Sequence, residues 1–336
     1  MFTKKSSFVM VLCLIVIIVM TLPTTFGAGK TYTLKLAHIT NEGHPVHQGA
    51  LLFKKTVEEN TKGQVKIDIF PNATLGSAPE FTEQMVVGAV DLGLSTSGQL
   101  QAFVREYATV MIPFLFEDYD HAHRTLDGKA GELLATMAEK KGFKVLGDWE
   151  WGFRAITNSK RPINTPEDLN GLKMRVPLEM QLQETFKALG SHCTVVAFPE
   201  LYMALAQGVV DGQCNPISTI YDQKFYEVQK YLAITNHSYN SEMLVMSKKV
   251  WDKMPSNIQK ILKEAAKDAA PLVRKLTIDS EQKLINEMKT KGMVVTYPNL
   301  APFREKTKPA IAPIAEFAGK DFTVQFLKYV EAARGK

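Results

Sequence analysis

Arginine and asparagine side chains at the ends of predicted strands are the residues best placed for binding chemistry. Across residues 170–177, apolar and basic residues alternate as in a strand, and Pro177 ends the strand two positions after Arg175. In doubly wound α/β sheets, ligands bind beyond the carboxyl ends of the strands. A guanidinium pairs with both oxygens of a carboxylate, which an ammonium group cannot do. We therefore expect Arg175 to bind a small organic acid; the alternative is a surface salt bridge.

Two further predicted strand ends carry polar side chains. Arg154 lies among aromatic residues in the stretch 149–157, and Asn215 ends a predicted strand just before Pro216. Arg154 could instead pair with an acidic neighbour, and Asn215 could cap the following helix. We favour ligand binding for both side chains, because each follows a strand at the edge where Arg175 is expected.

Enzyme and metal chemistry find little support in the sequence. The motifs G-x-S-x-G, H-E-x-x-H, G-x-G-x-x-G and the phosphate-binding G-x-x-x-x-G-K-[ST] are all absent. The histidine pairs 44/47 and 121/123 have no nearby cysteine or paired carboxylate, so we interpret them as surface histidines. We expect no catalytic residue, no metal and no cofactor.

The first residues of the chain have the order of a secretory signal peptide. Lys4 and Lys5 precede an apolar run over residues 8–20, which is too short to cross a bilayer comfortably, and small residues follow up to Ala28. We expect residues 1–27 to be removed, with cleavage after Gly27 or Ala28, and the protein to reach the periplasm. An uncleaved anchor is the alternative.

The remaining chain has the properties of a globular, near-neutral protein. Without residues 1–27, 309 of the 336 residues remain, and the loss of two lysines lowers the net charge from +5 to +3. This balance argues against nucleic-acid binding, which needs a concentrated basic face. A monomer is the default. Cys193 and Cys214 could form a disulfide after export, but two buried free thiols are favoured.

Alternating strands and helices predict two α/β units and a long helix. Ser256 is expected to cap that helix, which is ~50 Å long at 1.5 Å per residue and therefore long enough to span both units. Pro271 lies inside it, as a moving hinge or a fixed kink. The predicted elements are strands 32–37, 65–70, 90–95, 144–151, 172–176, 194–197 and 212–215, and helices 46–60, 79–88, 178–189, 199–207 and 256–291.

Four segments in order and spacing resemble the solute-binding subunits of tripartite ATP-independent periplasmic (TRAP) transporters, the DctP family. They are GLKMRVP at 171–177, FPELYMAL at 198–205, VDGQCNP at 210–216 and KFYEVQK at 224–230. The resemblance runs from Leu34 to about Pro309. It implies an α/β, two-lobed periplasmic-binding-protein fold with a long C-terminal helix spanning both lobes. The expected boundaries are 31–151 plus about 241–280 for lobe I, and 152–240 plus about 281–336 for lobe II.

The resemblance also implies roles for site residues. Arg175 would be the main carboxylate partner, Arg154 a second cation, Asn215 a donor to the carboxylate, and Phe198 a packing surface. Positions matching His38, Thr96 and Gln99 face the ligand in sialic-acid binders. Together with Trp149 and Glu179, these residues are expected to determine which acid binds.

Ligand identity is the least determined part of the prediction. An arginine and an acid that sialic-acid binders use are absent, and Cys214 stands where a glutamate is usual. The stretch 149–157 is closer to members that bind sugar acids, so we expect a hexuronate or aldonate. Alternatives are C4-dicarboxylates, keto acids and aromatic acids.

The resemblance implies uptake driven by an ion gradient through TRAP membrane permease subunits. A ligand sensor for a membrane kinase, a secreted enzyme and an ATP-driven uptake system are the other classes considered.

Overall fold

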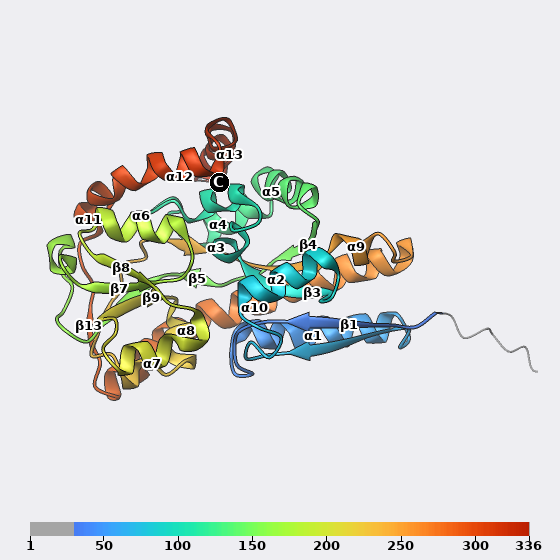
Figure 1. Cartoon of the computed structure of the whole chain (residues 1–336), viewed down its shortest axis with the longest axis horizontal. Helices are drawn as coiled ribbons and strands as arrows, with labels where there is room; N and C mark the ends of the chain where they lie inside the picture. The colour runs from blue at the N-terminus through green and yellow to red at the C-terminus, as the bar shows by residue number, and fades with distance from the viewer. Residues whose placement is uncertain (1–29, 336) are drawn as a thin grey trace, which may run out of the picture.

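The computed structural model describes residues 30–335. The predicted signal peptide at 1–27 and both cleavage positions lie outside these residues. No helix among the described residues is long and apolar enough to cross a membrane. The described chain forms two α/β lobes, each built on its own sheet (Figure 1).

The first lobe is built on a five-stranded sheet in the order β2-β1-β3-β12-β4. The first three strands are parallel, as the sequence predicts, whereas β12 runs antiparallel to both of its neighbours. All six residues of β12 are buried, so it lacks the alternation that reveals a strand, and the sequence does not predict it. The strands are β1 (Tyr32–Ala37), β2 (Val65–Phe70), β3 (Leu92–Thr96), β4 (Phe143–Asp148) and β12 (Glu242–Ser247).

The second lobe is built on a six-stranded sheet in the order β13-β10-β6-β9-β7-β8. Strand β7 is parallel to β8 and β9, as predicted, but β6 is antiparallel to β9 and β10. The strands are β6 (Ala155–Asn158), β7 (Lys173–Val176), β8 (His192–Val195), β9 (Gly212–Asn215), β10 (Tyr231–Ala233) and β13 (Val294–Thr296). The short strands β5 (Gly152–Phe153) and β11 (Tyr239–Asn240) pair antiparallel where the chain passes between the lobes.

Helices cover both sheets. The α-helices are α1 (Pro45–Asn60), α2 (Ala78–Val87), α3 (Ser97–Leu100), α4 (Tyr119–Leu126), α5 (Lys129–Lys140), α6 (Met180–Ala188), α7 (Leu201–Ala206), α8 (Ile217–Asp222), α9 (Lys248–Trp251), α10 (Ser256–Thr290), α11 (Leu300–Thr307), α12 (Ile311–Ala318) and α13 (Lys320–Ala333). The 3₁₀ segments are η1 (Arg105–Met111), η2 (Pro166–Leu169), η3 (Phe198–Glu200), η4 (Phe225–Glu227) and η5 (Lys308–Ala310).

Helix α10 joins the two lobes, as predicted. Residues from Ile258 to Val273 lie in the core of the first lobe, whereas Ile285 and Met288 lie in the core of the second. Pro271 lies inside the helix. The predicted cap is wrong: Ser256 is the first helical residue, and Pro255 precedes it without any side-chain cap.

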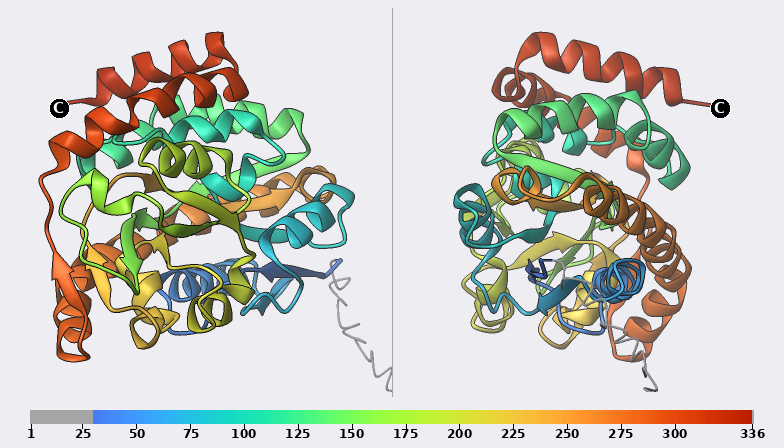
Figure 2. Two further views of the ribbon diagram at one scale, coloured as in Figure 1. Left: turned by 60° about the vertical axis from the view of Figure 1, so that its left-hand side comes forward. Right: turned by 90° about the vertical axis from the view of Figure 1, so that its right-hand side faces the viewer.

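The C-terminal helices connect the lobes a second time. Helices α11 and α12 pack against α6 of the second lobe, and α13 then packs against α4 and α5 of the first (Figure 2). The predicted boundary assigned the whole of 281–336 to lobe II. The contacts of α13 instead place the end of the chain on the first lobe.

The structure tests the predictions of free thiols and of surface histidines. Both cysteines are free thiols, as favoured, but only Cys214 is buried; the expected burial of Cys193 is wrong, because this residue is exposed. The expectation of surface histidines is wrong for His44, His47 and His121, which are all buried. His121, for example, lies 2.9 Å from the carbonyl oxygen of Val330 through Nε2. No cluster suited to a metal ion occurs among residues 30–335.

His44 caps the N-terminus of α1 in the first lobe and contacts α8 of the second lobe. Its Nδ1 accepts a hydrogen bond from the Val46 amide at 3.2 Å, which leaves Nε2, 3.2 Å from Thr219 Oγ1 in α8, to carry the proton. Protonation would remove the acceptor that caps the helix. Burial first, and the charge of His38 second, lower the pKa of His44 to about 3.

The neutral form of His44 makes part of the stability pH-dependent. Since the pKa in the folded state lies below the unfolded value, the unfolded chain binds more protons, and stability is lost as pH falls below about 6.5. At about pH 5 the loss from His44 is about 2 kcal/mol. We expect His44→Asn, which keeps a capping oxygen, to reduce the fall in unfolding free energy between about pH 7.5 and 5, measured by urea denaturation. A variant with the wild-type pH dependence would contradict this assignment.

Candidate functional site

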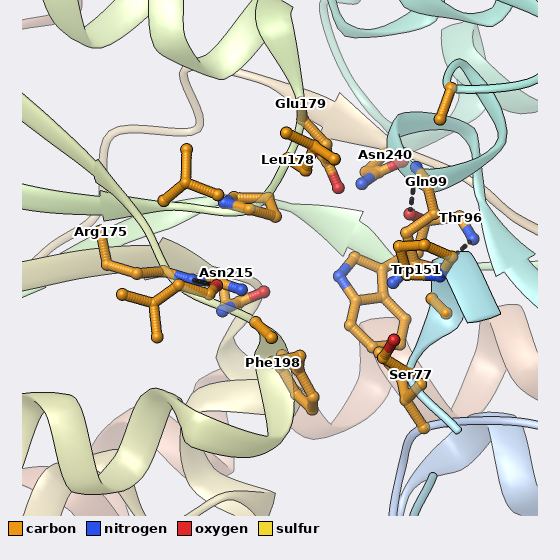
Figure 3. A pocket seen from close by; sticks show the side chains of 18 of the residues that line it. Ser77, Thr96, Gln99, Trp151, Arg175, Leu178, Glu179, Phe198, Asn215 and Asn240 are labelled. Atoms are coloured by element: carbon orange, nitrogen blue, oxygen red, sulfur yellow. Dashed lines mark hydrogen bonds between the residues drawn. The ribbon is translucent and has the colours of Figure 1, made fainter. Parts of the chain in front are cut away.

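A cavity of about 250 Å³ lies between the two lobes (Figure 3). Elements of both sheets and the crossing strands contribute to its walls. Its lining residues are Ile39, Ser77, Ala78, Pro79, Thr96, Gln99, Ala102, Trp151, Arg154, Arg175, Pro177, Leu178, Glu179, Val195, Val196, Ala197, Phe198, Asn215 and Asn240. Seven of the nine predicted site residues are among them.

Arg175 lies at the end of β7, as the strand pattern predicts. Its side chain is 2% exposed, and its Nε donates a hydrogen bond to the Val196 carbonyl at 2.9 Å. Within residues 30–335, neither Nη atom of Arg175 has a hydrogen-bond partner, and the side chain forms no salt bridge. Burial, and then the nearby charge of Arg154, lower the pKa of Arg175 to about 10. A buried cation without a counter-ion is costly, so the site favours an anion at this position.

Arg154 and Asn215 lie beside Arg175 and are fixed by neighbouring polar atoms. Arg154 donates through Nε to Cys214 Sγ at 3.2 Å and through one Nη to Asn215 Oδ1 at 3.2 Å. The Asn215 amide donates to Gln213 Oε1 at 2.7 Å. The alternative roles are not found: Arg154 forms no salt bridge in the described chain, and the position before α8 is taken by Pro216. Both side chains are therefore preorganised toward the cavity.

The opposite wall carries neutral polar groups. Thr96 and Gln99 form a capping box at the start of α3. The backbone N–H of Gln99 donates to Thr96 Oγ1 at 3.2 Å, and the backbone N–H of Thr96 donates to Gln99 Oε1 at 3.0 Å. This arrangement fixes the Gln99 side chain, which lines the cavity. Asn240 accepts from the Gly98 amide at 3.3 Å. The polar groups of this wall can exchange hydrogen bonds with hydroxyl groups but bring no charge.

Aromatic rings complete the pocket. Trp151 and Phe198 both line it and contact each other edge to face, with their ring centroids 6.5 Å apart. The His44 ring supports Trp151 at a centroid distance of 5.1 Å. An indole face suits the C–H surface of a small ligand, while the polar groups around it receive its oxygen atoms.

Two predicted site residues do not line the cavity. Trp149 is fully buried in the core of the first lobe, and its indole nitrogen donates to the Ala266 carbonyl at 2.9 Å. His38 is buried, with Nε2 3.0 Å from His47 Nδ1 and Nδ1 2.9 Å from Thr40 Oγ1. The prediction for Trp149 fails because β4 already ends at Asp148, so Trp149 turns toward α10.

Sequence reasoning missed Trp151, Asn240 and Ser77 as lining residues. Trp151 lies two positions after Trp149, and an extended chain would place both indoles on the same face, so the sequence does not tell them apart. Asn240 belongs to a two-residue crossing strand, and Ser77 precedes α2 in a loop. Neither of these two carries a sequence signal for binding.

Two α/β lobes that enclose an anion-binding cavity define a two-lobed solute-binding protein. A family model described as "Bacterial extracellular solute-binding protein, family 7" (DctP) matches residues 36–317, and the chain belongs to this family. The family match confirms the predicted family and function class, and the structural match below confirms the two-lobed α/β fold.

Several proteins of known name are similar to this chain. The 2,3-diketo-L-gulonate-binding periplasmic protein YiaO of Escherichia coli is 36% identical over 78% of this chain and 80% of its own length. A TRAP periplasmic solute-binding protein from Polaromonas, solved with D-erythronate, superposes with a TM-score of 0.87 at 37% identity, covering 91% of this chain and 100% of that chain. Another from Sulfitobacter, solved with β-D-galacturonate, has a TM-score of 0.86 at 31% identity, covering 89% and 99%.

Proposed function

We propose that the protein captures a small sugar acid, with Arg175 binding its carboxylate. The observation that carries this proposal is the burial of Arg175 with neither an ion-pair partner nor a protein acceptor for its Nη atoms among residues 30–335. Such a side chain is stabilised when a carboxylate forms two parallel hydrogen bonds with it. Arg154 supplies a second positive charge, and Asn215 a donor beside the carboxylate.

The remainder of the cavity suits a hydroxylated ligand. Thr96, Gln99, Asn240 and Ser77 offer neutral polar groups on the side away from the arginines. Trp151 and Phe198 together offer one apolar surface to a short carbon chain or sugar ring. The proteins similar to this one that were solved with D-erythronate and β-D-galacturonate support the choice of aldonates and hexuronates. Unsubstituted dicarboxylates such as succinate, and simple keto or aromatic acids, offer fewer hydroxyl groups to match this wall.

Binding is coupled to closure of the lobes. Gln101 of the first lobe donates to the Leu178 carbonyl of the second at 3.2 Å, beside the pocket. A ligand closes the protein to the extent that it binds the closed state more tightly than the open one. The enclosed acid loses contact with water, which strengthens its polar contacts with the two arginines.

The closed protein then delivers its ligand to TRAP membrane permease subunits in the periplasm. Family membership supports an extracytoplasmic binding role, and the charged start of the chain supports export by a signal peptide. The role is binding rather than catalysis, and no residue of the pocket forms a nucleophile and base pair in the described chain.

Thermal-shift screening of the mature protein tests this proposal. The panel contains hexuronates, aldonates, C4-dicarboxylates, keto acids and aromatic acids, and calorimetry follows for each acid that stabilises. We expect an aldonate or hexuronate to give the largest increase in Tm, because binding to the folded state alone stabilises it. Stabilisation by succinate or an aromatic acid, without any by a sugar acid, would contradict the proposed ligand class.

A further inference from the structure

Glu179 is an acidic side chain inside a pocket that binds an acid. It precedes α6 at the N-cap position, yet it makes no cap with the helix, and its carboxylate instead lines the cavity. The side chain reaches toward Asn240 on the opposite wall (Figure 3). A Cβ atom built on Gly98 would lie 2.2 Å from Glu179 Oε2, so the carboxylate rests directly against the backbone of α3 in the other lobe.

The Glu179 carboxylate has no hydrogen-bond partner among residues 30–335. It is 3% exposed, and Oε2 is buried without a hydrogen bond. Neither Arg154 nor Arg175 forms a salt bridge with it within the described residues, although both charges act on it. Burial raises the pKa of Glu179, and the two arginines oppose that rise. A buried carboxylate without a donor is costly to maintain, so its presence indicates a role in selecting the ligand.

The formal charges of the lining residues sum to a small net positive charge. Arg154, Arg175 and Glu179 are the ionisable side chains among the residues that line the cavity. With Glu179 ionised, two positive charges and one negative charge leave a net charge of +1. This balance neutralises one carboxylate of a ligand. A second carboxylate would lie among neutral groups and near Glu179, where like charges repel in a desolvated site.

We propose that Glu179 is a specificity-determining residue that restricts the site to singly charged hydroxy acids and rejects dicarboxylates. This proposal rests on the proposed capture of an acid by Arg175. A hydroxyl group of the ligand donates to the Glu179 carboxylate and supplies the hydrogen bond that no residue of the described chain provides. A ligand that presents a carboxylate there supplies no donor and adds repulsion.

Matched pairs of acids test the proposal by calorimetry. D-erythronate and meso-tartrate differ only in whether the terminal carbon is a hydroxymethyl group or a carboxylate, and so do D-galactonate and galactarate. For each pair, we compare the Kd of the monoacid with that of the diacid. We expect the wild type to prefer the monoacid by roughly tenfold or more, and Glu179→Gln to reduce that preference by roughly tenfold.

Control variants separate charge from folding. Glu179→Asp keeps the charge, so it should keep the preference for the monoacid even if both affinities fall. Glu184→Gln removes a charge from the same helix outside the pocket and should leave both Kd values unchanged. Circular dichroism melting verifies that each variant is folded.

The possible results distinguish the two proposals. An unchanged preference in Glu179→Gln, or a wild type that binds both acids of a pair equally well, overturns the role of Glu179 while leaving capture by Arg175 intact. If no acid of the pairs or of the screening panel binds the wild type, the proposed function fails, and the role of Glu179 fails with it.

Discussion

Replacing Arg175 by alanine is expected to weaken binding of the acid at least thirtyfold while leaving the fold intact. Removing one partner of a desolvated charge pair typically costs about 2–5 kcal/mol, and the lower limit corresponds to roughly thirtyfold in Kd. Arg175→Lys keeps a charge but loses the two-pronged geometry, so its affinity should lie between those of the wild type and the alanine variant. Calorimetry with the acid identified by screening measures each value.

The unliganded protein should respond in the opposite direction. Because Arg175 is buried without a salt bridge among the described residues, its removal relieves a desolvation cost, and the Tm of the ligand-free variant should equal or exceed that of the wild type. Arg105→Ala, at an exposed position in the first lobe, is the control and should change neither quantity. Unchanged affinity in Arg175→Ala would contradict the carboxylate role, and a large loss of Tm would indicate a structural role instead.

Parts of the site could be predicted because they depend on local sequence. Arg175 precedes the strand-ending Pro177 by two residues, and Asn215 precedes Pro216, so each position at a strand end follows from the chain itself. Both strands belong to the parallel part of the second sheet, where carboxyl ends meet at one edge. The pattern of residues is then sufficient to bring the two side chains together.

Other parts depend on contacts between distant segments. Strands β6 and β12 are buried along their whole length, so burial on both faces removes the alternation from which a strand is predicted. Asn240 reaches the pocket only because β11 pairs with β5, some ninety residues earlier in the chain. The return of α13 to α4 likewise rests on tertiary packing that no local pattern encodes.

Trp149 illustrates how a small error in a strand boundary changes a functional prediction. The sequence predicts a strand over 144–151, but β4 ends at Asp148. The indole of Trp149 then packs between α1 and α10: a Cβ atom on Gly49 would lie 3.0 Å from its ring, and its nitrogen donates to Ala266. Trp151 occupies the pocket instead. Substitution of Trp149 should therefore affect mainly stability, whereas substitution of Trp151 should affect mainly ligand binding.

We expect Trp149→Ala to lower the free energy of unfolding by about 3–5 kcal/mol, because it leaves a large cavity between the helices and removes the hydrogen bond to the Ala266 carbonyl. Urea denaturation measures this loss. Trp149→Phe fills most of that space, so it should fold and bind the acid with nearly wild-type affinity. Trp151→Ala should instead lose affinity, since its ring faces the ligand. A Trp149→Phe variant that keeps its stability but loses affinity would show that Trp149 takes part in ligand binding, and it would contradict the structural assignment.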